Sequence, residues 1–466
     1  MGEIDKEQKS LQTVTLAVVL LTNLVAPFAI ASMNVAAPQI GVEFDASATS
    51  LTWIILAYLL VTAIFSVPFG RLSDIKGRRK IFKIGLGLFF VASVFIIFSP
   101  SMAVFILLRI LQGIGAAMIF STNLALLVDV FPADKRGGVL GIAISCVYIG
   151  QSAGPVIGGF ITHAFGWRAV FIVISALAFV SLITAMARFP KEDIIKDENQ
   201  TIKTSSVILF ILSLGLLLYG IATLMQNIWS YFILAAGIVL LLIYVRLETR
   251  SDAPLLEVRL FKGNRAFSFA LLAVVFNYAA VFSITYLMSL YLQLARGFTA
   301  DISGLILICQ PIIQAALSPV AGRLSDKKPP SHLASFGMAC CATALFMFAF
   351  VNEQTPIPYI MAGLFLTGLG IAFFSSPNLN VIMSSVSSKD YGVATSLNTF
   401  TRTFGQVMGM ALLSLIIHLT IGDIPIAEVK PAALIYDMRV SFIVFAVICV
   451  AGIMVSLQRN EKKVGL

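Results

Sequence analysis

The chain is poor in charge. Asp, Glu, Lys and Arg make up 12% of its 466 residues, whereas hydrophobic residues make up 59%. Soluble globular proteins contain about 25% charged residues, because polar side chains must cover their surface. The low charge therefore excludes an ordinary soluble enzyme and indicates that lipid is the solvent. The apolar runs are continuous rather than alternating, which excludes a transmembrane β-barrel as well.

Motifs for catalysis and for metal or nucleotide binding are also missing. The five cysteines lie inside apolar runs, without the spacing of metal ligands or of a disulfide framework. The sequence GxxxxGK[ST] is absent, which argues against an ATP-driven pump. We therefore expect a protein that is not an enzyme and that has no metal or cofactor. No small-residue cleavage site follows the first apolar run, so we expect no cleaved signal peptide.

Fourteen apolar segments are present, and each is long enough to cross a bilayer as a helix, since a span needs about 20 residues. The predicted spans are 14–38, 51–71, 82–99, 102–129, 139–163, 167–189, 205–224, 229–248, 266–294, 301–322, 332–351, 357–386, 392–419 and 434–457.

The distribution of Lys and Arg orients these helices. With the N-terminus placed in the cytoplasm, 26 of the 32 Lys and Arg residues fall in cytoplasmic segments and four fall outside. This bias is the positive-inside signal of a membrane protein. It predicts a multi-pass protein of the plasma (inner) membrane with both termini in the cytoplasm. It also explains the net charge of +9 without a nucleic-acid partner.

An internal repeat divides the chain. GRLSD occurs at 70–74 and again at 322–326, and positions in two further helix pairs repeat at an offset of 255. Parallel repeats of this kind are typical of transporters, which bind substrate at the interface of the repeats. We predict an all-α membrane protein with two pseudo-symmetric six-helix halves. Its predicted parts are a cytoplasmic N-terminus (1–13), the two halves (14–190 and 265–457), two inserted helices (205–248) and a cytoplasmic tail (458–466).

A glycine-containing charged loop, GRLSDIKGRRK at 70–80, joins the second and third predicted helices. Its first glycine allows a neighbouring helix to approach, and its second permits a tight turn. The loop is either a plain basic loop or a gate, and the second GRLSD copy favours the gate. The candidate gating residues are Gly70, Asp74, Gly77, Arg78, Arg79, Asp129, Gly322 and Asp326. We expect Asp74, Arg78 and Asp129 to form a charge cluster that is intact when the cavity faces out.

Two arginines lie inside predicted helices, Arg109 in the fourth and Arg402 in the thirteenth. Each costs about 2.5–3.5 kcal/mol to place in a membrane, so each either faces a cavity or is satisfied by neighbouring helices. The Asp and Glu residues, in contrast, fall in loops or near helix ends, as Asp129 and Asp437 do. The candidate cavity residues are Arg109, Gln112, Gln310, Gln314, Asn378, Arg402 and Gln406.

Glycines without side chains allow close helix packing in both halves. The candidate packing residues are Gly150, Gly154, Pro155, Gly158, Gly159, Gly405 and Gly409. The first five lie in the fifth predicted helix, and the last two lie in the thirteenth.

Several of these segments resemble known motifs. The loop at 70–80 resembles the signature loop of the major facilitator superfamily, and LRILQGIG at 108–115 resembles its helix-4 motif. GQSAGPVIGG at 150–159 looks like the helix-5 antiporter motif, and APLLEVRLF at 253–261 is similar to a loop of the fourteen-helix drug:proton antiporters. The resemblance implies an efflux protein that exchanges hydrophobic or cationic compounds for protons. Its partners would be a small amphiphilic substrate, the bilayer and protons, and we expect a monomer.

One position departs from the family. The fourteen-helix antiporters usually have an Asp in helix 1, nine residues before a Pro, and Ala29 occupies that place before Pro38. Two alternatives therefore stay open. The chain could exchange or export anionic or neutral amphiphiles, including lipids, with Arg109 and Arg402 as the guides. It could also be a receptor or scaffold on a transporter fold, although a scaffold needs no repeated gate.

Overall fold

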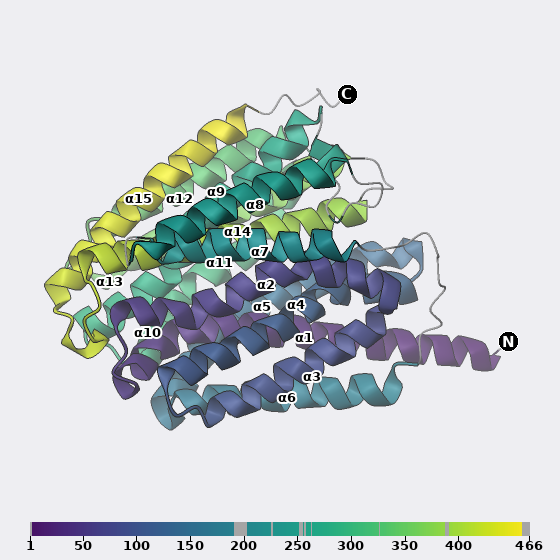
Figure 1. Ribbon diagram of the computed structural model, residues 1–466, viewed down its shortest axis with the longest axis horizontal. Coiled ribbons are helices and arrows are strands. Elements are labelled where there is room, and N and C mark those ends of the chain that lie inside the picture. The colour runs from purple at the N-terminus through teal and green to yellow at the C-terminus, as the bar shows by residue number, and fades with distance from the viewer. Residues whose placement is uncertain are drawn as a thin grey trace.

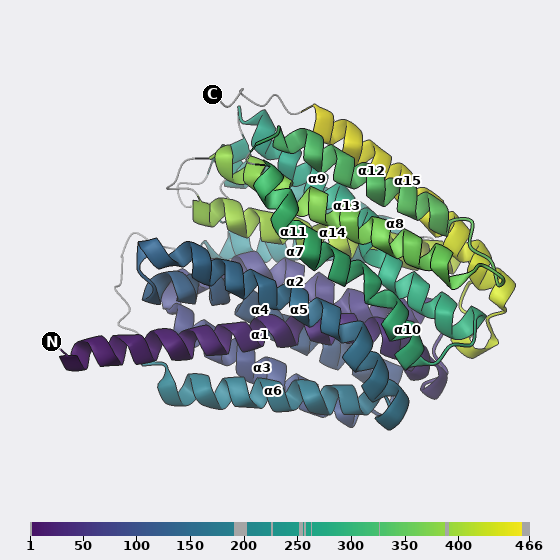
Figure 2. The same ribbon diagram turned by 180° about the vertical axis from the view of Figure 1, so that it is seen from behind.

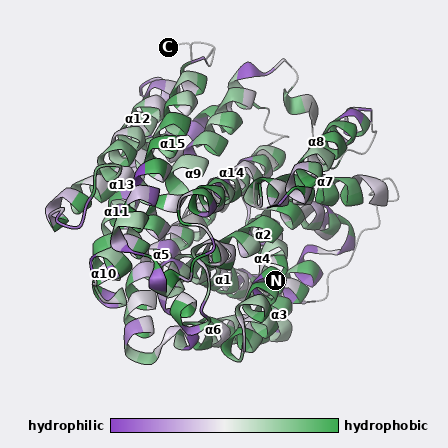
Figure 3. Ribbon diagram, turned by 60° about the vertical axis from the view of Figure 1, so that its left-hand side comes forward, coloured by the Kyte–Doolittle hydropathy of each residue, from purple (hydrophilic) through white to green (hydrophobic). Residues whose placement is uncertain are grey.

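The computed structural model describes residues 2–190, 203–224, 227–250, 255, 258–261, 263–325, 327–386 and 391–458. Its helices run side by side in one bundle (Figure 1). Within these residues, fourteen helical spans are long and apolar enough to cross a membrane, as predicted. Hydrophobic residues dominate along them (Figure 3). In lipid, backbone N–H and C=O groups must bond within the segment, which is why these apolar runs are helical. The predicted all-α membrane fold is confirmed.

Six helices precede residue 190 and lie together in the lower part of Figures 1 and 2. They are α1 (Gly2–Glu43), α2 (Ala48–Lys76), α3 (Arg78–Ile97), α4 (Met102–Val130), α5 (Ala133–Phe165) and α6 (Trp167–Arg188). We call this group the first half. Within it, α1 packs on α5, and α4 packs on α2 and α3.

The helices after residue 264 form the upper part of the same views. They are α9 (Arg265–Leu290), η2 (Tyr291–Ala295), α10 (Ala300–Leu307), α11 (Cys309–Ser325), α12 (Pro330–Phe348), α13 (Ile357–Ser384), α14 (Tyr391–Thr420) and α15 (Pro431–Leu457), with the short turns η1 (Val258–Phe261) and η4 (Ile426–Glu428). We call this group the second half. Its α9 packs on α14, and its α13 packs on α11 and α12.

Two helices connect the halves, α7 (Thr204–Ala222) and α8 (Trp229–Glu248). They pack on each other, and α7 also contacts α2 and α14. The ring of Phe210 on α7 lies 5.9 Å from that of Phe400 on α14. Helices α7 and α8 therefore cover one side of the interface between the two halves.

Two tight connections depend on glycine. Gly77 separates α2 from α3 with a φ of 96°, and Gly166 separates α5 from α6 with a φ of 81°. L-residues with side chains rarely adopt this region of φ, whereas glycine enters it at little cost. One residue is therefore enough to reverse the chain at each place.

The span predicted at 301–322 is interrupted. It consists of α10 and α11, and the helix assignment breaks at Ile308. Pro311 has no N–H to donate to the carbonyl of Leu307, and its ring crowds that carbonyl, so the helix cannot continue regularly. The break lies beside a cavity that Leu307, Gln310 and Pro311 all line.

The start of α1 and the end of α15 lie at one end of the bundle, which we call the termini side (Figure 1); the opposite end is the far side. On the far side the halves are hydrogen-bonded to each other. The N–H of Ala48 donates to the carbonyl of Ile424 (3.1 Å), and the N–H of Ile426 donates to the carbonyl of Ala46 (3.0 Å). We call this two-bond contact the far-side latch. Together with other seam contacts there, it closes the far side.

Candidate substrate cavity and gate

A cavity lies between the two halves, near the middle of the bundle. Helices α1, α2, α4 and α5 of the first half and α9, α10, α11, α13 and α14 of the second contribute to its wall. Its polar lining residues are Asn34, Thr62, Ser66, Tyr148, Gln151, Tyr278, Thr285, Gln310, Gln314, Thr399, Arg402, Thr403 and Gln406. Its apolar wall includes Ile30, Leu59, Phe120, Val147, Val281, Phe282, Leu307 and Ile371. The mixture of apolar surface and a few polar groups is typical of small-molecule sites.

Four of the candidate cavity residues line this space: Gln310, Gln314, Arg402 and Gln406. Arg402 lies near the middle of α14, one helical turn before Gln406. The buried Nε of Arg402 has no hydrogen-bond partner among the described residues. Arg402 is also the only charged side chain among the described lining residues, so the cavity holds a cation without a neighbouring carboxylate.

Arg109 and Gln112 do not line the cavity, and the expectation for them is corrected. Both are completely buried inside the first half. The Nε of Arg109 donates to the carbonyl of Ile54 (3.0 Å), and its Nη1 donates to Gln112. Gln112 in turn donates to Ser93 (2.7 Å). The guanidinium also lies over the ring of Tyr58, 4.4 Å from its centroid. Arg109 thus ties α2, α3 and α4 together instead of meeting a ligand.

Asn378 is a second correction. It is 1% exposed, and its Nδ2 donates to the carbonyl of Ala270 on α9 (3.3 Å). A side chain turned toward α9 does not reach the cavity wall, and Asn378 is not part of it. The repeat explains the role, since Asn123 stands 255 residues earlier and bonds to Asn23 on α1. Both asparagines join helices within their own half.

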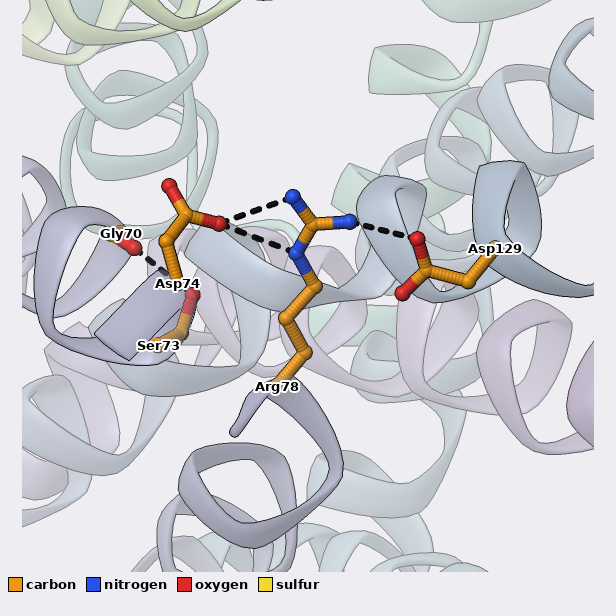
Figure 4. Close-up of polar contacts among 5 residues, drawn as sticks. All are labelled: Gly70, Ser73, Asp74, Arg78 and Asp129. Carbon is orange, nitrogen blue, oxygen red and sulfur yellow. Dashed lines mark hydrogen bonds and ion pairs between the residues drawn. The ribbon is translucent and has the colours of Figure 1, made fainter. Parts of the chain in front are cut away.

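The charged loop forms the expected cluster (Figure 4). Asp74 accepts from the Nε and Nη2 of Arg78 at 3.0 and 2.8 Å, and Asp129 accepts from its Nη1 at 2.6 Å. These ion pairs link α2, α3 and α4 at the termini side, and their side chains are about one-third exposed. The cluster lies within the first half and is formed while the far side is closed. The cluster was expected to be intact when the cavity faces out, but here it is formed without a cavity that opens to the far side.

The remaining gating candidates surround this cluster or repeat it. Gly70 faces Ser121 of α4, and a Cβ built at Gly70 would lie 3.7 Å from it. Gly322 faces Ser376 of α13 in the same way at 3.8 Å, so the two glycines have equivalent surroundings in the two halves. Arg79 is the second residue of α3, directly after Arg78. Asp326 lies outside the described residues.

The packing candidates separate into two groups. Gly150, Gly154 and Gly158 hold α5 against α1 in the first half, and Gly405 and Gly409 hold α14 against α9 in the second. Gly159 and Pro155 instead meet α10 across the seam. A Cβ at Gly159 would lie 2.5 Å from the carbonyl oxygen of Ala300, and the carbonyl of Pro155 sits against Gly304. The far side is therefore closed by backbone that lies directly against backbone.

Several cavity residues were outside the candidate set. Gln151 on α5 and Tyr278 and Thr285 on α9 face the same space. The repeat offset could have indicated Gln151, because its counterpart Gln406 was a candidate. Asp437, expected near a helix end, is 0% exposed and lies six residues inside α15. Burial of this kind depends on which helices surround it, so the sequence carried no signal for it.

Comparison with known proteins agrees with this geometry. The sequence model of the Major Facilitator Superfamily matches residues 19–250 and 270–465. The riboflavin transporter RibZ of Clostridioides difficile is 27% identical, over 82% of this chain and 83% of the relative. The multidrug resistance protein Stp of Mycobacterium tuberculosis is 29% identical, over 82% and 71%. The multidrug efflux pump LfrA of Mycolicibacterium smegmatis is 27% identical, over 86% and 80%.

Solved structures share the fold. A D-xylose-proton symporter superposes with a TM-score of 0.70 at 15% identity and covers 97% of this chain and 99% of that one. A bacterial homologue of the lysosomal transporter Spinster gives a TM-score of 0.68, also at 15% identity, over 97% and 99%. At this identity the likeness establishes the fold alone.

Proposed function

Since the chain belongs to the Major Facilitator Superfamily of secondary transporters, we propose that it exports amphiphilic small molecules by alternating access. The cavity between the halves is the binding site, and its wall contains residues of both. Relative motion of the halves would expose this site to one side of the membrane and then to the other. Because one chain supplies the whole cavity wall, a monomer is sufficient.

The charge of the cavity indicates the substrate class. Its one charged lining side chain is Arg402, and no carboxylate in the described wall offsets it. A cationic substrate would meet repulsion there, whereas an anionic or neutral polar group can accept hydrogen bonds from the guanidinium. We therefore favour anionic or neutral amphiphiles. The relative RibZ is named as a riboflavin transporter, which agrees with a neutral aromatic substrate. The names of Stp and LfrA favour multidrug efflux, which is the competing function.

The orientation is part of the proposal. The Lys and Arg distribution supports a termini side that faces the cytoplasm in the plasma (inner) membrane. The closed far side is then the outer side, and the cavity in this structure is shut off from the outside. The cluster of Asp74, Arg78 and Asp129 belongs to the cytoplasmic gate, and the equivalent glycines Gly70 and Gly322 give that gate a counterpart in each half.

The test is transport by purified protein in proteoliposomes. A cationic, a neutral and an anionic aromatic dye are compared, with ethidium, riboflavin and fluorescein as the probes. A hydrogen bond to a charged group contributes about 1.5–3 kcal/mol, so Arg402→Gln should lower uptake of the preferred dye by about tenfold or more. Arg402→Lys keeps the charge and should retain part of the activity.

Arg246→Gln is the matched control, because Arg246 is exposed on α8 and does not line the cavity. It should transport like the wild type. If ethidium is the best substrate and Arg402→Gln leaves its uptake unchanged, the proposed substrate class is wrong. If none of the dyes moves in any variant while the protein is folded, efflux of aromatic amphiphiles is refuted.

A further inference from the structure

Asp437 is a carboxylic acid enclosed by the second half. It is 0% exposed, and it lies on α15 close to the end of α14. The hydroxyl of Thr420, the last residue of α14, donates to Oδ1 of Asp437 at 2.5 Å. The other carboxyl oxygen, Oδ2, is buried and has no partner among the described residues.

Two further polar groups near Asp437 are buried and unsatisfied. Tyr286 on α9 lies near enough to Asp437 for the two groups to interact electrostatically, and Ser441 follows Asp437 by one helical turn on α15. Both hydroxyls are buried and lack a partner within the described part of the chain. Buried polar groups are nearly always hydrogen-bonded, so a cluster of three unsatisfied ones indicates a place for a proton or for water.

Charged side chains on the surrounding elements are directed elsewhere. Arg439, two residues along α15, is exposed, and Lys430 at the start of α15 is exposed too. Arg296 after η2 donates to the hydroxyl of Tyr291 (3.2 Å) and to the carbonyl of Thr355. His418 on α14 lies 3.8 Å from Asp423. The neighbouring α12 presents the ring of Phe348, which packs on Phe442.

The burial decides the charge state of Asp437. An isolated carboxylate costs several kcal/mol to bury, even after relaxation, unless a cation offsets it. No cation is in contact with Asp437 among the described residues. In the closed state the side chain is therefore a neutral, protonated acid.

The same acid is connected to the far-side latch. The loop at 421–430 runs directly from Thr420 to α15. It contains Ile424, which bonds to Ala48 at the start of α2, and Ile426, which bonds to Ala46 in the loop before α2. When the halves separate on the far side, these two bonds must break. The loop that begins directly after Thr420, the hydrogen-bond partner of Asp437, is then released from the first half, and we expect water to gain access to the acid.

We propose that Asp437 is a proton-binding site coupled to the far-side latch. It holds its proton while the latch is closed and releases it to water on the far side when the latch opens. This inference rests on the proposed function only in assuming alternating access.

Opening of the far side can be measured by double electron–electron resonance without any substrate. Spin labels are placed on the exposed Val42 of α1 and on the exposed Ala427 of η4, on either side of the latch. The partly exposed Cys146 and Cys309 are changed to serine, and the three buried cysteines remain. In the wild-type background, raising the pH from about 5 to about 9 should increase the far-side-open population, because only the deprotonated acid requires water.

Asp437→Asn keeps the shape of the side chain but stays neutral at every pH. The far-side-open population of this variant should therefore be independent of pH. At high pH it should be about tenfold lower than that of the wild type, which is the change that one pH unit produces in a single titrating group. Thr420→Val removes the donor to the carboxylate and should move the midpoint of the transition to higher pH. Asp423→Asn is the matched control, since its side chain is 67% exposed in the same loop, and it should behave like the wild type.

The outcomes are separable. A pH-independent distance distribution in the wild type refutes the inference, and so does a wild-type pH response in Asp437→Asn. Either result with normal dye uptake leaves the proposed function intact. Ethidium as the best substrate, with its uptake unchanged in Arg402→Gln and the pH response of opening retained, refutes the substrate class and leaves the proton site standing.

Discussion

Gly159 should determine how tightly the far side closes. In the structure a Cβ at this position would lie 2.5 Å from the carbonyl oxygen of Ala300 in the other half. Ordinary van der Waals contact begins at 3.4 Å. The obstacle is backbone at the start of α10, which cannot rotate away as a side chain could. Gly159→Ala therefore requires the seam to separate by nearly an ångström.

The free-energy cost of this clash applies only to the state in which the far side is closed. Overpacking of this kind costs about 1–3 kcal/mol. When the halves part on the far side, Ala300 moves away from α5 and the clash disappears. The substitution should thus shift the equilibrium toward the far-side-open state by about 5- to 150-fold. Gly304→Ala should act in the same direction, because its Cβ would meet the carbonyl of Pro155 across the same seam.

The assay is the distance distribution between spin labels at positions 42 and 427, measured with the folded yield and melting temperature. Two control glycines distinguish the seam from general damage. A Cβ at Gly154 would meet Ala31 in the same half, so Gly154→Ala should lower the melting temperature without opening the far side. A Cβ at Gly87 meets nothing within 4 Å, and Gly87→Ala should match the wild type in both measurements. If Gly159→Ala is folded and its distances equal those of the wild type, the seam argument is refuted.

Two further predictions concern the gate and the topology. Asp74→Asn should depress transport while the folded yield stays nearly unchanged, because ion pairs this exposed contribute about 0–1 kcal/mol to stability; wild-type transport rates in proteoliposomes would count against a role in gating. A cysteine replacing the exposed Glu353 at the far side should react with a membrane-impermeant maleimide in intact cells, whereas one replacing Lys203 should react only after permeabilisation; the reverse pattern would invert the proposed orientation.

Composition and periodicity were sufficient for the fold. A chain with 12% charge and fourteen long apolar runs has only one way to satisfy its backbone in lipid, which is to form spanning helices. In the structure the repeated glycines Gly70 and Gly322 have equivalent surroundings, which agrees with the internal repeat seen in the sequence. The interruption between α10 and α11 was missed, although Pro311 was visible in the sequence.

The site was only partly predictable. Arg402 and Gln406 share a helix face, and both line the cavity. Arg109 and Gln112 are also separated by one helical turn, yet their face packs inside the first half. Helical periodicity predicts which residues share a face of a helix, but it does not predict whether that face lines a cavity or packs against another helix. The cost of an unpaired arginine in lipid is avoided equally well by a cavity or by neighbouring carbonyls.

The sequence by itself determined that this protein spans the membrane, how many times it does so, and which segments repeat, because these properties depend on local hydropathy and on backbone hydrogen bonding. Only the tertiary structure decided which polar residues face the cavity, that Gly159 meets Ala300, and that Asp437 is completely buried beside the end of α14. Those facts depend on contacts between residues more than a hundred positions apart, or on burial by several helices at once. Neither can be predicted from the local pattern of residues in the sequence.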